Sequence, residues 1–170
     1  MRQLRYSVAA SLDGFIAGPK GDYDWIPADP EIDFAALYAR FSAIVMGRRS
    51  YEAFAGSAGG GSSLPVFVCS RTEPEGERDG VTFVRDAVAH VTAARRGDGK
   101  PLWLWGGGDL FRSLAGAGLV DGVDVAIIPI LLGGGVPLLP SPGPRLNLQL
   151  QNHRVYSATG TTILEYDVRR

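Results

Sequence analysis

The sequence predicts an α/β fold in which helices flank a central, mostly parallel β-sheet. Short runs rich in Val, Ile, Leu and aromatic residues alternate with helical patterns along most of the chain. The last two apolar runs follow each other directly and meet at 158–160, which predicts a closing antiparallel hairpin. A chain of 170 residues suits one domain, which we expect to span residues 1–170.

The expected elements follow from these runs in chain order. The strands are Leu4–Ala10, Ala43–Met46, Pro65–Ser70, Val81–Val84, Leu102–Trp105, Val123–Pro129, Leu146–Val155 and Thr161–Val168. The helices are Pro30–Ser42, Arg48–Phe54, Asp86–Arg95 and Gly108–Ala115. Asp29 and Pro30 are the expected N-cap and first-turn residues of the first helix. The Gly/Ser-rich stretch Phe54–Ser63 has linker composition but is too short to separate two domains.

Composition and charge argue against several classes of protein. The net charge is −1 and no basic block is present, so nothing favours nucleic-acid binding. No apolar stretch reaches the roughly 20 residues that a membrane span needs. Cys69 is the only cysteine, and His90 and His153 lack metal-type spacing, so we expect neither a disulfide nor a metal site. The first residues lack the pattern of a signal peptide, which makes the cytoplasm the expected location.

A glycine turn, Gly106–Gly108, separates the apolar strand Leu102–Trp105 from a helical pattern that begins at Leu110. Glycine lets another group approach the backbone closely, and a strand–turn–helix layout points free N–H groups at an anionic ligand. A tight turn without a ligand explains the same residues. The turn alone therefore leaves both interpretations open.

Two further strand ends carry groups that suit a phosphate. Gly47 is followed by Arg48, Arg49 and Ser50 in the first turn of an expected helix, where positive side chains oppose the helix dipole unless an anion is present. Arginine also presents a planar fork that fits phosphate, although a solvated surface pair is the alternative. Ser70 and Arg71 close another strand. Ligands of open α/β sheets collect beyond such carboxyl ends, which favours one shared anion site.

Four blocks of the chain together resemble the dihydrofolate reductase superfamily. They are Ser-Leu-Asp-Gly-Phe-Ile-Ala at 11–17, Val-Met-Gly-Arg-Arg-Ser-Tyr-Glu at 45–52, Trp-Gly-Gly-Gly-Asp-Leu at 105–110 and Ile-Ile-Pro-Ile-Leu-Leu-Gly-Gly-Gly-Val-Pro-Leu-Leu at 127–139. Their order matches the family from about Leu4 to Val168. The nearest branch is similar to the reductase domain of bacterial riboflavin biosynthesis, the RibD C-terminal type.

The resemblance implies a dihydrofolate reductase-like three-layer fold with NADPH as hydride donor. By position, backbone groups of Ala9 and Ile16 would hold the nicotinamide carboxamide, and Arg48 would meet the 2′-phosphate. The remaining positions would face the diphosphate, the adenosine or the nicotinamide. These implied cofactor residues are Gly47, Arg49, Ser50, Ser70, Arg71, Gly106, Gly107, Gly108, Asp109 and Leu110.

The substrate side is less defined by the sequence. The family pattern places a carboxylate early in the second strand-to-helix segment, so Glu31 and Asp33 are the catalytic candidates, although both also suit a helix first turn without any such role. Asp13 is a candidate substrate residue, and bracing of a turn is the alternative. Trp25 fits either a substrate-side aromatic or a loop anchor.

The function implied is an NADPH-dependent reductase that delivers hydride to a pterin- or pyrimidine-like small molecule. It would resemble either dihydrofolate reductase or 5-amino-6-(5-phosphoribosylamino)uracil reductase. The lysine usual after the Ser-Leu-Asp-Gly block in the riboflavin branch is replaced by Phe15, which argues against a phosphoribosyl substrate. A nucleotide- or flavin-binding module without reductase activity is the alternative. Related domains resemble dimers, and the long terminal strands need cover, so we expect a homodimer.

Overall fold

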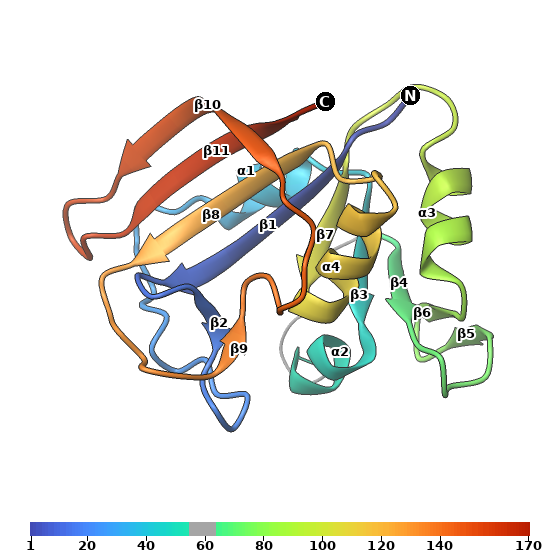
Figure 1. Cartoon of the computed structure of the whole chain (residues 1–170), viewed down its shortest axis with the longest axis horizontal. Coiled ribbons are helices and arrows are strands. Elements are labelled where there is room, and N and C mark those ends of the chain that lie inside the picture. The colour runs from blue at the N-terminus through green and yellow to red at the C-terminus, as the bar shows by residue number, and fades with distance from the viewer. Residues whose placement is uncertain (55–63) are drawn as a thin grey trace.

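The computed structural model of the chain describes residues 1–54 and 64–170. It contains one large sheet of nine strands in the order β10-β11-β8-β1-β7-β3-β4-β6-β5 and a small sheet of β2 and β9 (Figure 1). The central strands pair in parallel, whereas β11 pairs antiparallel with β8 and with β10. The expected α/β fold with a mostly parallel sheet and a closing antiparallel hairpin is therefore confirmed.

The strands of the large sheet range from three residues in β5 to nine in β10. They are β1 Leu4–Ser11, β3 Ala43–Gly47, β4 Val66–Cys69, β5 Gly76–Arg78, β6 Val81–Val84, β7 Leu102–Gly106, β8 Gly122–Ile128, β10 Asn147–Val155 and β11 Thr162–Arg169. The small sheet joins β2 Phe15–Ala17 to β9 Val136–Pro137. The expected strands all form, with ends shifted by a residue or so. Sequence patterns missed β2, β5 and β9, because strands of two or three residues carry too little periodicity to detect.

Helices cover both faces of the sheet, as Figure 1 shows for α4 in front of the strands and α1 behind them. The helices are α1 Phe34–Ala39, α2 Arg48–Phe54, α3 Ala87–Ala94 and α4 Gly108–Gly116. Val91 of α3 and Phe111 of α4 join one buried cluster, in which Tyr6 stacks on Phe111 at 4.0 Å. On the other face, side chains of α1 and α2 pack against a second cluster around Trp103. The central strands carry apolar side chains on both faces, so helices cover the sheet from both sides and the fold has three layers.

The first helix is shorter than expected, and its cap differs. We expected a helix over Pro30–Ser42 with Asp29 as N-cap, but α1 begins at Phe34 and Asp33 caps it through Ala36 N–H at 2.9 Å. Asp29 is buried and bonds elsewhere: it accepts from the Thr159 hydroxyl at 2.7 Å. This contact reaches across to the hairpin turn between β10 and β11. The other Asp29 oxygen accepts from the Glu31 N–H at 2.9 Å, so this carboxylate joins a local turn to the hairpin and does not cap α1.

The Gly/Ser-rich stretch that we expected to be a linker lies, apart from Phe54, outside the described residues. Among the residues that the structure does describe, no helix is long and apolar enough to cross a membrane. No group of three or more His, Cys, Asp or Glu side chains in this described part of the chain could hold a metal ion.

Candidate functional site

A large groove runs along the carboxyl ends of the central strands and across the α1 side of the sheet. It has a volume of about 1320 Å³. Every residue that the sequence suggests for cofactor contact lines it, although these residues are spread from position 9 to position 110. They are Ala9, Ile16, Gly47, Arg48, Arg49, Ser50, Ser70, Arg71, Gly106, Gly107, Gly108, Asp109 and Leu110.

Two glycine turns meet at the centre of this groove because β3 and β7 are parallel neighbours. A Cβ added at Gly47 would lie 3.8 Å from the Gly107 nitrogen, and one at Gly107 would lie 3.4 Å from Ser50 Oγ. Gly106 has a φ of +148°, a conformation that side-chain-bearing residues rarely adopt. The two turns therefore bring the main chains at the ends of β3 and β7 together beside the Ser50 hydroxyl.

The start of α4 faces the same place with its N–H groups uncapped by a side chain. Its N-cap is Gly107, and no side-chain hydrogen bond caps it. An uncapped helix start of this kind favours an anion. Asp109 lies in the first turn but is largely exposed and pairs with Arg112 at 3.1 Å, which partly offsets its negative charge.

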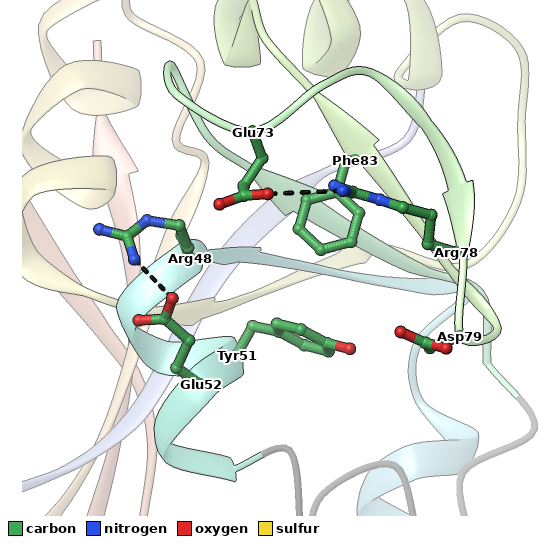
Figure 2. A pocket seen from close by; sticks show the side chains of 7 residues that line it. All are labelled: Arg48, Tyr51, Glu52, Glu73, Arg78, Asp79 and Phe83. Carbon is green, nitrogen blue, oxygen red and sulfur yellow. Dashed lines mark hydrogen bonds and ion pairs between the residues drawn. The ribbon is translucent and has the colours of Figure 1, made fainter.

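Arg48 lies where this groove meets a smaller pocket of about 240 Å³, drawn in Figure 2. Its guanidinium contacts Glu52 of the same helix at 2.5 Å, and both side chains are partly exposed. Across the pocket, Arg78 pairs with Glu73 at 3.4 Å and lies 4.0 Å from the centre of the Phe83 ring. Figure 2 shows these two ion pairs on opposite sides of the opening. Arg48 is thus held by an ion pair with a residue one helical turn away, near the surface.

Ser70 and Cys69 close β4 at the same edge of the sheet. The Ser70 hydroxyl accepts from the N–H groups of Thr72 and Glu73 at 3.3 and 3.1 Å, so it orders the loop that carries Arg71. Burial raises the pKa of the Cys69 thiol to about 12, so this sulfur is protonated at neutral pH. A protonated thiol is a poor nucleophile, in line with its expected role as a core residue.

The structure does not bring the four other candidate residues into the groove. Asp13 accepts from the Ser11 hydroxyl at 2.6 Å and from the N–H groups of Leu132 and Gly133 at 3.1 and 2.7 Å. It thereby ties the loop after β1 to the loop after β8, which is the bracing role considered as its alternative. The Ser11 hydrogen bond is the main reason that the pKa of Asp13 is lowered.

Trp25 and the early carboxylates are engaged outside the groove as well. Trp25 donates its indole N–H to the Asp22 carbonyl at 3.1 Å, a loop-anchoring contact. Glu31 precedes α1 and lies 3.8 Å from Arg154, with both side chains more than half exposed. Asp33 is the N-cap described above. Their neighbours Ile32 and Phe34 line the groove, so the segment borders it while its carboxylates do not.

The inner end of the groove contains polar residues that sequence reasoning missed. β1, β8 and β11 contribute Ser7, Asp124 and Glu165, which lie in one row because Ser7 pairs with Asp124 and Asp124 with Glu165. Arg40, which follows α1, also lines the groove and contacts Glu165 at 2.6 Å. Their separation in sequence gives no motif, so only the register of the sheet identifies the group.

Asp124 forms a buried ion pair with Arg5, which donates hydrogen bonds to both carboxylate oxygens at 3.0 and 2.7 Å. The guanidinium also reaches Asp167 at 2.8 Å and lies over Gly122, where any Cβ would collide with it. The Asp124 hydrogen bond is the main reason that the pKa of Arg5 is raised, despite burial, which acts in the opposite direction. A buried ion pair of this kind fixes the floor of the groove.

Aromatic side chains line the groove beside this polar row. The rings of Trp103 and Trp105 are 4.4 Å apart, and Tyr38 of α1 lies 5.3 Å from Trp103. The Trp103 indole N–H donates to the Ser7 carbonyl at 2.8 Å, which orients its ring against the floor. A groove with one anion-suited end and one aromatic end fits a long ligand beside a flat ring.

Comparison with known proteins assigns the chain to a family. The family model of the RibD C-terminal domain matches residues 2–161. The chain belongs to the RibD C-terminal domain family. Two Bacillus subtilis (strain 168) proteins are similar: YyaP is 29% identical, covering 92% of this chain and 90% of its own length, and YwjB is 24% identical, covering 88% and 89%. The resemblance seen in the four sequence blocks is therefore confirmed.

Solved structures show the same fold. A candidate riboflavin biosynthesis protein from Shewanella sp. PV-4 superposes with a TM-score of 0.82 at 30% identity over 100% of both chains. Dihydrofolate reductase from Enterococcus faecalis, complexed with NADP(H) and RAB-propyl, gives a TM-score of 0.74 at 17% identity, covering 99% of this chain and 97% of that one. The bifunctional deaminase/reductase from Thermotoga maritima gives 0.71 at 16% identity, and the match covers 99% of this chain and 57% of that longer one. The dihydrofolate reductase-like fold is confirmed.

Proposed function

We propose that this chain is an NADPH-dependent reductase that delivers hydride to a pterin- or pyrimidine-like small molecule. The observation that carries the proposal is the convergence of every implied cofactor position on one groove. Those positions come from the ends of several parallel strands, which chain order alone does not bring together. The family also supports the general class, because its solved relatives include reductases.

The residues present suit the proposed cofactor. The uncapped start of α4 and Ser50 would face the diphosphate, and Arg48 offers a cation for the additional phosphate that distinguishes NADPH from NADH. Ala9 and Ile16 also line the groove, and their backbone groups would hold the nicotinamide carboxamide. When bound, NADPH supplies hydride. The chain would hold the nicotinamide beside the substrate ring and exclude water from the contact.

The proposal is tested by titrating the purified protein with NADPH and with NADH and following quenching of tryptophan fluorescence. Trp103 and Trp105 line the groove and therefore report on its occupancy. We expect NADPH to bind at least about tenfold more tightly, because one charge-assisted phosphate contact is worth that factor. Equal and weak binding of both nucleotides would contradict the proposal. Loss of NADPH absorbance in the presence of dihydrofolate or 5-amino-6-substituted uracils then identifies the acceptor.

A nucleotide- or flavin-binding module without reductase activity is the second candidate. It would keep the phosphate-suited strand ends, and the absence of Glu31 and Asp33 from the groove is the observation that favours it. Mass spectrometry of the ligand that co-purifies with the protein separates the two. A tightly bound flavin, together with no NADPH oxidation against any acceptor, would favour the binding module.

We also propose that the protein acts as a cytoplasmic homodimer. Strand β10 is a sheet edge, and each of its nine residues is exposed. Leu148, Leu150 and Val155 are 41%, 49% and 62% exposed on it. An unpaired strand edge of nine residues with three exposed apolar side chains needs cover, and a second copy would provide it. Sedimentation velocity measures the mass in solution, and a monomer at micromolar concentration would contradict this part of the proposal.

A further inference from the structure

The groove has a carboxylate on its inner floor that no sequence motif identified. Glu165 projects from β11 between Asp124 of β8 and Asn152 of β10, its partners in the sheet register. It lines the groove, whereas Glu31 and Asp33 do not. The inner end of the groove therefore takes its acidic groups from the sheet and not from the segment before α1.

Of the two carboxylates on this floor, Glu165 is the one open to a ligand. Each oxygen of Asp124 accepts one hydrogen bond from the buried Arg5 guanidinium, and the Asp124 side chain is only 5% exposed, whereas that of Glu165 is 16% exposed. Each oxygen of Glu165 has one contact given by the structure: Asn152 donates to Oε2 at 3.0 Å, and Arg40 approaches Oε1 at 2.6 Å. A carboxylate oxygen accepts two hydrogen bonds, so Glu165 retains acceptor capacity toward the groove.

Arg40 provides a donor directly beside that acceptor. It follows α1, and its side chain is 47% exposed while that of Glu165 is 16% exposed. Both residues line the groove, so their pair presents an acceptor and a planar donor group side by side. Burial acts to raise the pKa of Glu165, but the hydrogen bonds from Asn152 and Arg40 and the charges of Arg40 and Arg5 outweigh it and lower that pKa. Glu165 is thus ionised at neutral pH and accepts hydrogen bonds.

We propose that Glu165 and Arg40 together determine substrate specificity by binding the lactam edge of a heterocycle. Glu165 accepts from a ring N–H, and Arg40 donates to the carbonyl next to it. The ring itself then lies against the aromatic side of the groove formed by Trp103, Trp105 and Tyr38. This inference rests on the proposed function, because it assigns the inner end of the groove to the substrate of that reductase.

The chemistry of the pair selects among flat rings. A pyrimidinone or pterinone offers an N–H and a carbonyl on adjacent ring atoms, which matches one acceptor beside one donor. A ring with a methyl group on that nitrogen offers Glu165 no ring donor, so the charge-assisted hydrogen bond to the ring is lost. A hydrocarbon ring or a flavin-sized aromatic without an accessible amide N–H gains the stacking contact alone. The Glu165–Arg40 pair therefore distinguishes lactam rings from rings of equal size that lack an N–H next to a carbonyl.

The experiment compares 7,8-dihydropterin with its 3-methyl derivative in the protein saturated with NADP⁺, which has no hydride to transfer, so that binding is measured without turnover. Binding is followed by quenching of tryptophan fluorescence. The wild-type protein is expected to bind dihydropterin about tenfold more tightly than the methylated ring, because one charge-assisted hydrogen bond is lost. In Glu165→Gln, dihydropterin binding is expected to weaken about tenfold while the methylated ring binds as before. The methyl comparison uses the wild-type protein, so it holds whether or not a variant folds.

Glu77→Gln is the matched control. Glu77 is exposed on β5, at the opposite edge of the sheet, and does not line the groove. It should leave the affinity for both rings unchanged. Equal binding of the two rings by wild type, or no binding of dihydropterin and 5,6-diaminouracil at millimolar concentration, would overturn the lactam assignment. A parallel NADPH titration separates this failure from that of the proposed function, which falls if NADPH itself does not bind.

Discussion

Two ion pairs at opposite ends of the groove use the same chemistry in different surroundings. At the inner end, Arg5 and Asp124 are 2.7 Å apart, and their side chains are only 11% and 5% exposed. At the outer end, Arg48 and Glu52 are 2.5 Å apart, and their side chains are 37% and 53% exposed. Distance alone does not separate the two pairs. Burial does, and it determines which arginine can change partner.

Separating a buried guanidinium from its carboxylate is costly, because water does not reach the charges to compensate the lost contact. Arg5 therefore serves the architecture of the floor and leaves Glu165 as the carboxylate that faces the groove. An exposed pair contributes little, and water compensates either partner when they separate. Arg48 can therefore exchange Glu52 for a phosphate at small cost. The inner end is rigid and suited to selectivity, and the outer end is adaptable and suited to anion capture.

The largest expected effect is at the inner pair. Asp124→Ala removes both hydrogen bonds of the Arg5 side chain to that carboxylate and leaves the charge with the more exposed Asp167. We expect a loss of about 3 kcal/mol in the free energy of unfolding, as for other buried pairs that lose one partner. Urea denaturation followed by circular dichroism measures this.

Glu52→Ala is the matched measurement at the outer pair. Its free energy of unfolding should fall by less than about 0.5 kcal/mol, because the pair is exposed and lies within one helix. Similar losses in the two variants would show that burial does not distinguish the pairs, and the comparison of the two ends would then fail.

Arg48→Ala should produce the next largest effect, on binding and not on stability. Removing the cation is expected to weaken NADPH binding about tenfold, because a charge-assisted contact to the additional phosphate is lost. NADH lacks that phosphate, so its affinity should not change. Tryptophan fluorescence titration with both nucleotides measures the ratio. An unchanged NADPH/NADH preference would remove Arg48 from this role.

Asp13 provides a smaller effect midway between the ends, where it joins two loops that border the groove. The Ser11 hydrogen bond and two backbone N–H groups lower the pKa of its carboxyl in the folded state. Its contribution to stability is therefore complete above the ordinary Asp pKa and is lost as pH falls through the lowered folded value. Asp13→Asn should be less stable than wild type at neutral pH, and the difference should shrink on acidification.

Urea midpoints of both proteins measured from neutral to acidic pH test this sign. A difference between wild type and Asp13→Asn that grows as pH falls would contradict the bracing role. Asp98→Asn is a suitable control, because Asp98 lies in the turn after α3 and pairs with the amino terminus at the surface.

The residues that we propose for cofactor contact could be identified from sequence because their pattern is local, and the structure places them in one groove. Each strand end carries its own short motif, such as Gly47-Arg48-Arg49-Ser50, and parallel strands bring their carboxyl ends to one edge. The strands were predictable for the same reason: continuous apolar runs such as Ala43–Met46 need no tertiary information. In this part of the sheet, the pairing of the strands agrees with what the local sequence pattern predicts.

The inner end was not predictable, because its residues come from distant positions with no pattern of their own. Arg5, Asp124 and Glu165 meet only through the pairing of β1, β8 and β11. Asp29 is not the predicted helix cap: α1 begins at Phe34, and the Asp29 carboxylate accepts from the Glu31 N–H and from a hydroxyl 130 residues away. Long-range partners can reverse what local propensity favours, and one sequence without its register does not reveal them.

The smallest expected effect tests whether Glu52 competes with the ligand for Arg48. Glu52→Gln removes the negative charge but keeps the length of the side chain, so Arg48 no longer gives up an ion pair when it binds a phosphate. A pair at this helical spacing is worth about 0.3–0.5 kcal/mol, so NADPH affinity should rise about twofold while NADH affinity stays the same. The gain should diminish at high salt, because screening weakens the competing pair in wild type as well. Weaker NADPH binding in this variant would instead mean that Glu52 orients Arg48 toward the groove, and the outer pair would then be as fixed in its function as the buried pair is in its structure.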